Sequence, residues 1–244
     1  MKQILLILTL TLTIFACKKK SVEIIPLTVS ENGLVAYYPL DGNANDLTSF
    51  RNHGTISALS TPDRKGTPNK AYDFVRHEFQ SSKIPINLKN NYTFSFWIKM
   101  NFYDDGMAVM ELAKDKNCNR NPQIWQLQNS IYLTPTTDPF NSIKIMSLGG
   151  IKTGTESPSW KHVLWTVQND STSVYVNGNL VGTKMLTWRD LSNVDLTLGT
   201  AGNHCTGDSG ASNYHNQPSR VSIDEVRIYN RVLSFTEIRE LSRF

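Results

Sequence analysis

The sequence predicts an all-β fold with one short helix at its C-terminus, and three observations lead to this prediction. Apolar and polar residues alternate along segments such as Tyr92–Lys99, with the two-residue period of a strand that buries one face. Turn sequences, above all Asn177-Gly178, separate these segments. A helical pattern occurs only in the last residues of the chain. Residues 31–244 have the length of one large β-sandwich or of two small β domains.

The N-terminus has the features of an export signal. A lysine follows the initiator methionine, the apolar block Ile4–Phe15 comes next, and the small residue Ala16 precedes Cys17. This block is too short to remain as a membrane-spanning helix. Ile14-Phe15-Ala16-Cys17 resembles the lipobox of bacterial lipoproteins, in which a peptidase cuts before the cysteine and acyl chains are attached to it. An ordinary cleaved signal with a chance cysteine is the alternative.

A lipidated Cys17 predicts where the protein resides. Residues 1–16 are then the signal peptide, residues 17–30 the acylated cysteine and a tether, and residues 31–244 the folded domain. Buried acyl chains would hold the protein at a membrane of the bacterial cell envelope, and the outer membrane is the first expectation. Lys18-Lys19-Lys20 either adds attraction to anionic headgroups or begins a solvated tether. No lysine-rich run recurs and the formal net charge is +4, which argues against a nucleic-acid partner.

Three local signals place elements within the domain. The alternating segments are Tyr92–Lys99, Val163–Val167 and Ser173–Gly182. The last of these carries Asn177-Gly178 at its centre, which predicts a tight β-hairpin. Ser234-Phe235-Thr236-Glu237 is a capping box, and Ile238 and Leu241 follow on one helical face. The C-terminal helix is therefore expected to start at this box.

The apolar phase changes within the strand that precedes this helix. Val221 and Ile223 hold one phase. Val226 and Ile228 hold the other, so the buried face switches across Asp224-Glu225. A β-bulge explains such a switch, and it would turn one of the two adjacent carboxylates away from the regular alternation.

Four sequence blocks resemble, in order, the laminin G-like domains of the concanavalin A-like jelly-roll family. The blocks are Gly33–Asp46 with Asn52–Thr55, Trp160–Val163, Tyr175–Gly178 and Ile223–Ser234. The resemblance spans nearly the whole mature chain and implies two stacked antiparallel sheets of six or seven strands, with the first and last strands adjacent. The chain departs from the family at Thr200–Arg220, a long polar loop where a short turn is usual.

The same resemblance implies a structural calcium ion where the first and last strands meet. Its carboxylate ligands fall on Asp41 and Asp224, with oxygens near Asn43 completing the shell. The residues themselves agree, because Asp41, Asn43, Asn45 and Asp46 crowd oxygen donors into one turn, as calcium requires. The alternative is an Asx-rich turn whose side chains bind their own backbone.

Cys118 and Cys205 remain once Cys17 is assigned to lipid. An exported protein folds in an oxidising compartment, so a disulfide between them is the default expectation. Two buried thiols are the alternative.

No catalytic pattern survives inspection, and the protein is expected not to be an enzyme. Gly207-Asp208-Ser209-Gly210 follows His204 in one loop, whereas serine-protease chemistry brings base and nucleophile from distant elements. The spacing of His204, Cys205, Asp208 and His215 matches no zinc template. Glycosidases of this fold need paired carboxylates, and no strand carries a Glu-x-Asp-x-Glu run.

A binding surface is the remaining functional expectation. The resemblance favours a glycan ligand, and a protein partner in adhesion is the alternative, because one fold supports many functions. Trp97, Trp160 and Trp165 are expected in the core. The candidate ligand-binding residues are Trp125, Trp188, Asn213 and Tyr214, and Trp188 is the aromatic residue most expected to be exposed.

Overall fold

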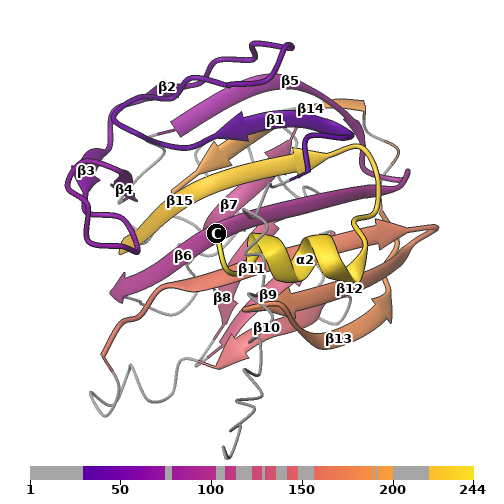
Figure 1. The fold of residues 1–244 in the computed structure, drawn as a ribbon. Coiled ribbons are helices and arrows are strands. Elements are labelled where there is room, and N and C mark those ends of the chain that lie inside the picture. Colours follow the sequence, from indigo (N-terminus) through magenta and orange to yellow (C-terminus); the bar gives the residue numbers. More distant parts are fainter. Residues whose placement is uncertain are drawn as a thin grey trace, which may run out of the picture.

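The computed structural model describes residues 30–74, 79–102, 108–113, 123–127, 130–135, 142–147, 157–188, 190, 192–199 and 220–244 (Figure 1). These residues form two antiparallel sheets and one helix. Sheet A has eight strands in the order β13-β12-β11-β6-β15-β4-β3, with β1 paired to β15 outside this path. Sheet B has seven strands in the order β10-β9-β8-β7-β14-β5-β2.

Each sheet draws its strands from all parts of the sequence. The strands of sheet A are β1 (Leu34–Tyr38), β3 (Leu59–Thr61), β4 (Ala71–Phe74), β6 (Tyr92–Phe102), β11 (Lys161–Gln168), β12 (Ser171–Val176), β13 (Asn179–Met185) and β15 (Arg220–Tyr229). Those of sheet B are β2 (Thr55–Ile56), β5 (Phe79–Asn87), β7 (Ala108–Ala113), β8 (Gln123–Leu127), β9 (Ser130–Thr134), β10 (Ile143–Ser147) and β14 (Ser192–Leu198). The all-β fold predicted from alternation and the two sheets that the resemblance implied are confirmed, with eight strands in sheet A where six or seven were expected.

The main core lies between the two sheets. Phe94, Phe96 and Ile98 of β6 face inward, as their two-residue spacing requires, and are at most 2% exposed. Trp165 of β11 is fully buried and stacks on Phe94 with ring centroids 4.5 Å apart. Sheet B closes the core from the other side with residues such as Leu196.

The hairpin, the bulge and the adjacency of the terminal strands are confirmed. Strands β12 and β13 flank Asn177-Gly178, and both turn residues have positive φ, as a tight hairpin requires. In β15, Asp224 pairs with Trp97 and the next aligned residue is Arg227, so Glu225 and Val226 form a bulge. Glu225 has φ +57°, which re-aims its side chain.

Helix α2 (Phe235–Leu241) covers part of the outer face of sheet A (Figure 1). The predicted capping box is present, with both reciprocal hydrogen bonds between Ser234 and Glu237. Ile238 and Leu241 are buried in a second small cluster with Leu164 and Tyr229. Helix α2 therefore buries part of the outer face of sheet A.

Two tryptophans that the sequence placed in the core lie on the outer face of sheet A instead. Trp97 occupies the phase of β6 opposite to Phe96 and Ile98, and its ring lies 4.9 Å from the guanidinium carbon of Arg64. Trp160 is half-buried beside the ammonium of Lys99. A cation over each ring makes this position favourable, which aromatic character alone does not reveal.

Candidate functional site

A continuous polar row crosses the outer face of sheet B. The backbone register aligns six residues on six adjacent strands, from β2 to β9: Thr55, Gln80, Thr197, Glu111, Gln123 and Thr134. Their neighbours along the strands, such as Leu196 and Leu112, point into the core. Since successive residues of a strand face opposite sides, Thr197, Glu111 and Thr134 lie on the side of sheet B away from the core, while Gln123 is placed by its backbone register alone.

The centre of the polar row is shielded from solvent, while one end of it is open. Glu111 and Thr197 are each 5% exposed and Thr134 is fully buried. Thr55 and Gln80 at the β2 edge are exposed. The carboxylate of Glu111 thus lies near hydroxyl groups in surroundings with little water, where hydrogen bonds are stronger.

A second, shorter row lies two residues further along β8 and β9. Its members are Lys144 on β10, Tyr132 on β9 and Trp125 on β8, aligned by the backbone register. Tyr132 is half-buried and Lys144 is exposed. The spacing of two residues puts this row about 7 Å from the polar row on the same face. An aromatic ring can stack on the apolar side of a sugar ring, and polar side chains next to it can bind the sugar hydroxyls.

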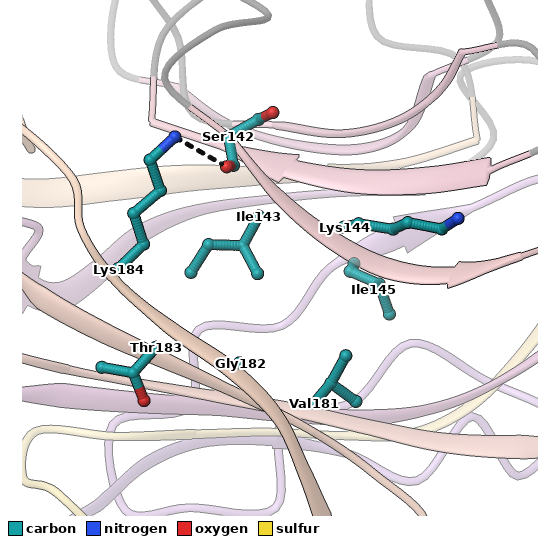
Figure 2. Close-up of a pocket in the computed structure, with 8 residues that line it drawn as sticks. All are labelled: Ser142, Ile143, Lys144, Ile145, Val181, Gly182, Thr183 and Lys184. Carbon is teal, nitrogen blue, oxygen red and sulfur yellow. Dashed lines mark hydrogen bonds between the residues drawn. The ribbon is translucent and has the colours of Figure 1, made fainter.

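A cavity of about 440 Å³ opens beside this face, between the edge strands β10 and β13 (Figure 2). Ile143 and Ile145 line it from β10 and Val181 lines it from β13. At its rim the ammonium of Lys184 donates to the carbonyl oxygen of Ser142 at 3.3 Å, whereas Lys144 points away (Figure 2). Ile143 and Ile145 also belong to the core cluster, and polar residues such as Thr183 complete the lining.

The predicted calcium residues lie near one another but are bound by cations of the protein itself. Lys70 Nζ donates to Asp41 Oδ2 at 2.7 Å. The pKa of Lys70 is raised mainly by this hydrogen bond, and the charges of Asp63 and Asp224 add to the rise. The structure thus brings Asp41 and Asp224 into one region, as the resemblance implied, with a lysine among their carboxylates.

Asp224 is 1% exposed and its Oδ2 accepts a hydrogen bond of 2.7 Å from Nη1 of Arg64. Burial raises the pKa of Asp224 to about 7, Glu225 adds to the rise, and Arg64 opposes it. Within the described residues there is no group of three His, Cys, Asp or Glu side chains placed to hold a metal ion. As arranged here, these residues do not fit a calcium ion, and the calcium site stays a prediction without support from their geometry.

The side chains of the Asx-rich turn bind the backbone of their own loop, which was the alternative to a calcium site. The carboxylate of Asp46 accepts hydrogen bonds from the backbone of Tyr37, Thr48 and Asn52 at 2.9 to 3.0 Å, and a fourth from the Thr48 hydroxyl. The Asn43 side chain accepts from the backbone of Asn45 and donates to the carbonyl of Asp41. These oxygens organise the loop after β1.

The expectation of an exposed, ligand-binding Trp188 was wrong. Trp188 is 2% exposed, its ring packs edge-on against Tyr92, and its indole Nε1 donates to Thr172 Oγ1 at 2.8 Å. Its neighbours in the sequence suggested a surface turn, but a buried hydroxyl satisfies the indole and lets the ring enter the core.

The other predicted sites fall outside the described residues or only partly inside them. Cys17, Cys118, Cys205, Asn213 and Tyr214 lie outside the described ranges. For Trp125 the backbone position on β8 is described. The lipid anchor, the disulfide and the loop ligands therefore stay predictions. No helix in the described ranges is long and apolar enough to cross a membrane.

The sequence reasoning missed the polar row. Its signal was present as single polar residues between apolar ones, Met110-Glu111-Leu112 and Leu196-Thr197-Leu198. Each reads as an ordinary strand with one solvated face. Only the order of strands in sheet B reveals that these residues align.

Comparison with known proteins places the chain in a fold family. Residues 71–239 match the family model for the laminin G type of the concanavalin A-like lectin/glucanases superfamily. No curated protein matches the chain in sequence. Domain 4 of an extracellular arabinanase from Geobacillus stearothermophilus, in complex with arabinotriose, is similar with a TM-score of 0.57 and 18% identity, over 87% of this chain and 100% of that one.

Two further structures show how widely the fold is used. The binding domain of botulinum neurotoxin DC in complex with rat synaptotagmin II has a TM-score of 0.60 and 13% identity, over 86% of this chain and 51% of that one. A Trypanosoma rangeli sialidase in complex with 2,3-difluorosialic acid has a TM-score of 0.59 and 16% identity, over 88% and 33%. At such identities the likeness shows the fold alone, which binding domains and glycosidases share.

Proposed function

Because the chain belongs to the concanavalin A-like lectin/glucanases superfamily, we propose that it is a non-catalytic glycan-binding module that is held at a bacterial membrane. One observation carries the proposal: the polar row centred on Glu111 lies next to the register of Tyr132 and Trp125 on the outer face of sheet B. The similar arabinanase domain, solved with arabinotriose, supports the ligand class.

In the proposed complex the ring of Tyr132 stacks on the apolar side of a sugar. The carboxylate of Glu111 accepts hydrogen bonds from sugar hydroxyls, and the hydroxyl of Thr197 donates to or accepts from them. The exposed Thr55 and Gln80 extend this contact toward the β2 edge. A chain of several sugar units lying across the strands meets both rows, because the polar row spans six strands.

The carboxylates described on this face support a non-catalytic role. Hydrolysis needs two carboxyl groups, one on each side of the glycosidic bond. Asp195 shares the strand phase of Thr197, but its Oδ1 accepts a hydrogen bond from the backbone of Lys83 at 3.0 Å. Glu111 is therefore proposed to bind the sugar rather than act as one member of a catalytic pair.

The membrane anchor is the second part of the proposal and rests on the lipobox-like run that ends at Cys17. The acylated tether would then hold a bound glycan at the cell envelope. Metabolic labelling with an acyl chain should mark the wild-type chain and leave Cys17→Ser unlabelled. Equal labelling of both would remove this part of the proposal.

Glycan-array binding of the purified full-length protein tests the ligand. We expect binding to plant or microbial polysaccharides, and a fall in affinity of about tenfold or more in Tyr132→Ala, as for an aromatic hot spot. Phe235→Ala is the control, because Phe235 is an exposed aromatic residue on α2, far from sheet B.

Three results would overturn the proposal. The first is a glycan array without hits, combined with capture of one defined protein partner. The second is a loss of binding in Phe235→Ala equal to that in Tyr132→Ala. The third is release of reducing ends from a bound glycan. The first would favour the adhesion alternative and the last a glycosidase.

A further inference from the structure

The junction between the loop after β1 and the bulge of β15 contains an ionic network that the proposed glycan face does not use. Arg64 Nη1 lies 2.7 Å from Asp224 Oδ2 and 4.0 Å from Glu225 Oε1. Arg227 Nη2 lies 2.6 Å from Glu225 Oε2, which also accepts a hydrogen bond from the hydroxyl of Tyr37 at 2.9 Å. Two carboxyl groups and two guanidinium groups are thus joined in one network.

The side chains of this network are shielded from water. Those of Arg64 and Asp224 are 7% and 2% exposed, and those of Arg227 and Glu225 are 4% and 12% exposed. Arg64 lies over the ring of Trp97, and Arg227 lies over the ring of Tyr37 at 4.1 Å. Charges buried to this degree persist only when they are paired, so each member depends on its partner.

The loop between β3 and β4 presents two of its three cations to carboxylates of this region. Asp63 Oδ1 accepts backbone hydrogen bonds from Lys65 at 2.8 Å and from Thr67 at 2.7 Å, which closes the turn around Arg64. At the end of the same loop, Lys70 reaches Asp41. One short loop therefore supplies two positive charges, to Asp224 and to Asp41.

We infer that Arg64 and Lys70 together take the place of a divalent cation at the junction of the β1 loop and β15. The total charge they bring is that of a calcium ion, and they bind the two carboxylates, those of Asp41 and Asp224, that the sequence resemblance assigned to calcium. A calcium ion needs about six to eight oxygen ligands, and cationic nitrogens now occupy positions on both carboxylates. It would also stand next to a guanidinium group in surroundings with little water, where repulsion between charges is strong.

The inference goes beyond glycan binding, because it states how the terminal strands are held together and that no metal is needed there. The experiment compares the thermal unfolding of the full-length protein with excess calcium and with excess chelator. We expect the same midpoint in both. A saturable rise of the midpoint with calcium that Asp224→Asn abolishes would overturn the inference.

Removal of the two cations tests the replacement directly. In the double variant Arg64→Gln/Lys70→Gln the carboxylates lose their partners, and we expect its unfolding midpoint to rise with calcium where that of the wild type does not. Asp224→Asn in the same background should abolish this response, and Lys89→Gln, at an exposed lysine elsewhere, should not create one. A double variant that folds and ignores calcium would contradict the inference. If the double variant does not fold, the wild-type comparison alone still decides.

Discussion

Ser95 Oγ lies 2.8 Å from Nε2 of His162 on the outer face of sheet A. Both residues are buried, with 1% of each exposed. Within the described part of the chain, Nδ1 of His162 has no hydrogen-bond partner. A serine next to a histidine suggests a nucleophile and its base, but a catalytic pair needs an orienting carboxylate and access for the substrate. Burial, followed by the charges of Arg227 and Arg64, lowers the pKa of His162 to about 3.

The low pKa of His162 predicts loss of stability in mild acid. Between pH 6.5 and about 3 the unfolded histidine binds a proton that the folded one does not, so the free energy of unfolding falls as pH falls through this range. In urea unfolding at several pH values, His162→Gln should show a shallower fall than the wild type. His53→Gln, at an exposed histidine, is the control. Equal slopes for His162→Gln and the wild type would contradict the prediction.

Asp46→Ala should destabilise the protein by about 3 kcal/mol, because four hydrogen bonds converge on this buried carboxylate and three backbone donors would lose their partner. The exposed Asn43 makes only contacts within its own turn, so Asn43→Ala should cost less than about 1 kcal/mol. Denaturant unfolding measures both values. Similar losses in the two variants would show that the loop is not organised by Asp46.

Glu237 contributes stability that depends on its charge. Its hydrogen bond with Arg231 is the main cause that lowers its pKa to about 2, and the capping box adds to this effect. The contribution is present above pH 4.5, the value of a free glutamate, and is lost as pH falls toward 2. Glu237→Gln should lower the free energy of unfolding at neutral pH by about 1 kcal/mol.

Glu240→Gln is the matched control for this prediction, since it removes the same charge from the same helix without touching the cap. The difference between the two variants at neutral pH should shrink at low pH. A difference that stays constant down to pH 2 would show that the charge of Glu237 has no part in it.

Trp188→Ala should destabilise the protein by about 3 to 5 kcal/mol, as for other large buried rings. Trp188→Phe keeps most of the packing but loses the hydrogen bond to Thr172, and about 1 kcal/mol with it. Because the ring lies in the core, Trp188→Phe should bind glycans with wild-type affinity. A selective loss of binding in a stable Trp188→Phe would restore the ligand role that the sequence suggested.

Apart from the adjacency of the first and last strands, which the family resemblance implied, the features that the sequence predicted correctly are local ones. Asn177-Gly178 determines a hairpin because its two residues must adopt positive φ, and Ser234 with Glu237 determines a helix start through bonds three residues apart. The bulge at Asp224-Glu225 was readable because the two-residue period must shift when one residue is added to a strand. None of these requires knowledge of distant parts of the chain.

The errors concern which residues meet. Trp188 was expected at the surface and is buried, because its indole donates a hydrogen bond to the buried Thr172. Trp97 was expected in the core and lies on the outer face of sheet A, where Arg64 lies over its ring. The calcium assignment stays a prediction; it was made from the carboxylates alone, and the β3–β4 loop brings cations to them. Ion pairs between residues far apart in the sequence produce no repeating pattern of residue types.

The sequence by itself determined that this protein is built of strands with one short C-terminal helix, since alternation, turn residues and capping act over a few neighbouring positions. Only the tertiary structure decided what its surfaces offer. Thr55, Gln80, Thr197, Glu111, Gln123 and Thr134 form one row because hydrogen bonding between strands fixes their order in sheet B, and that order is independent of their order along the chain. The same physical reason places Arg64 against Asp224, residues that backbone pairing and burial bring together from opposite ends of the domain.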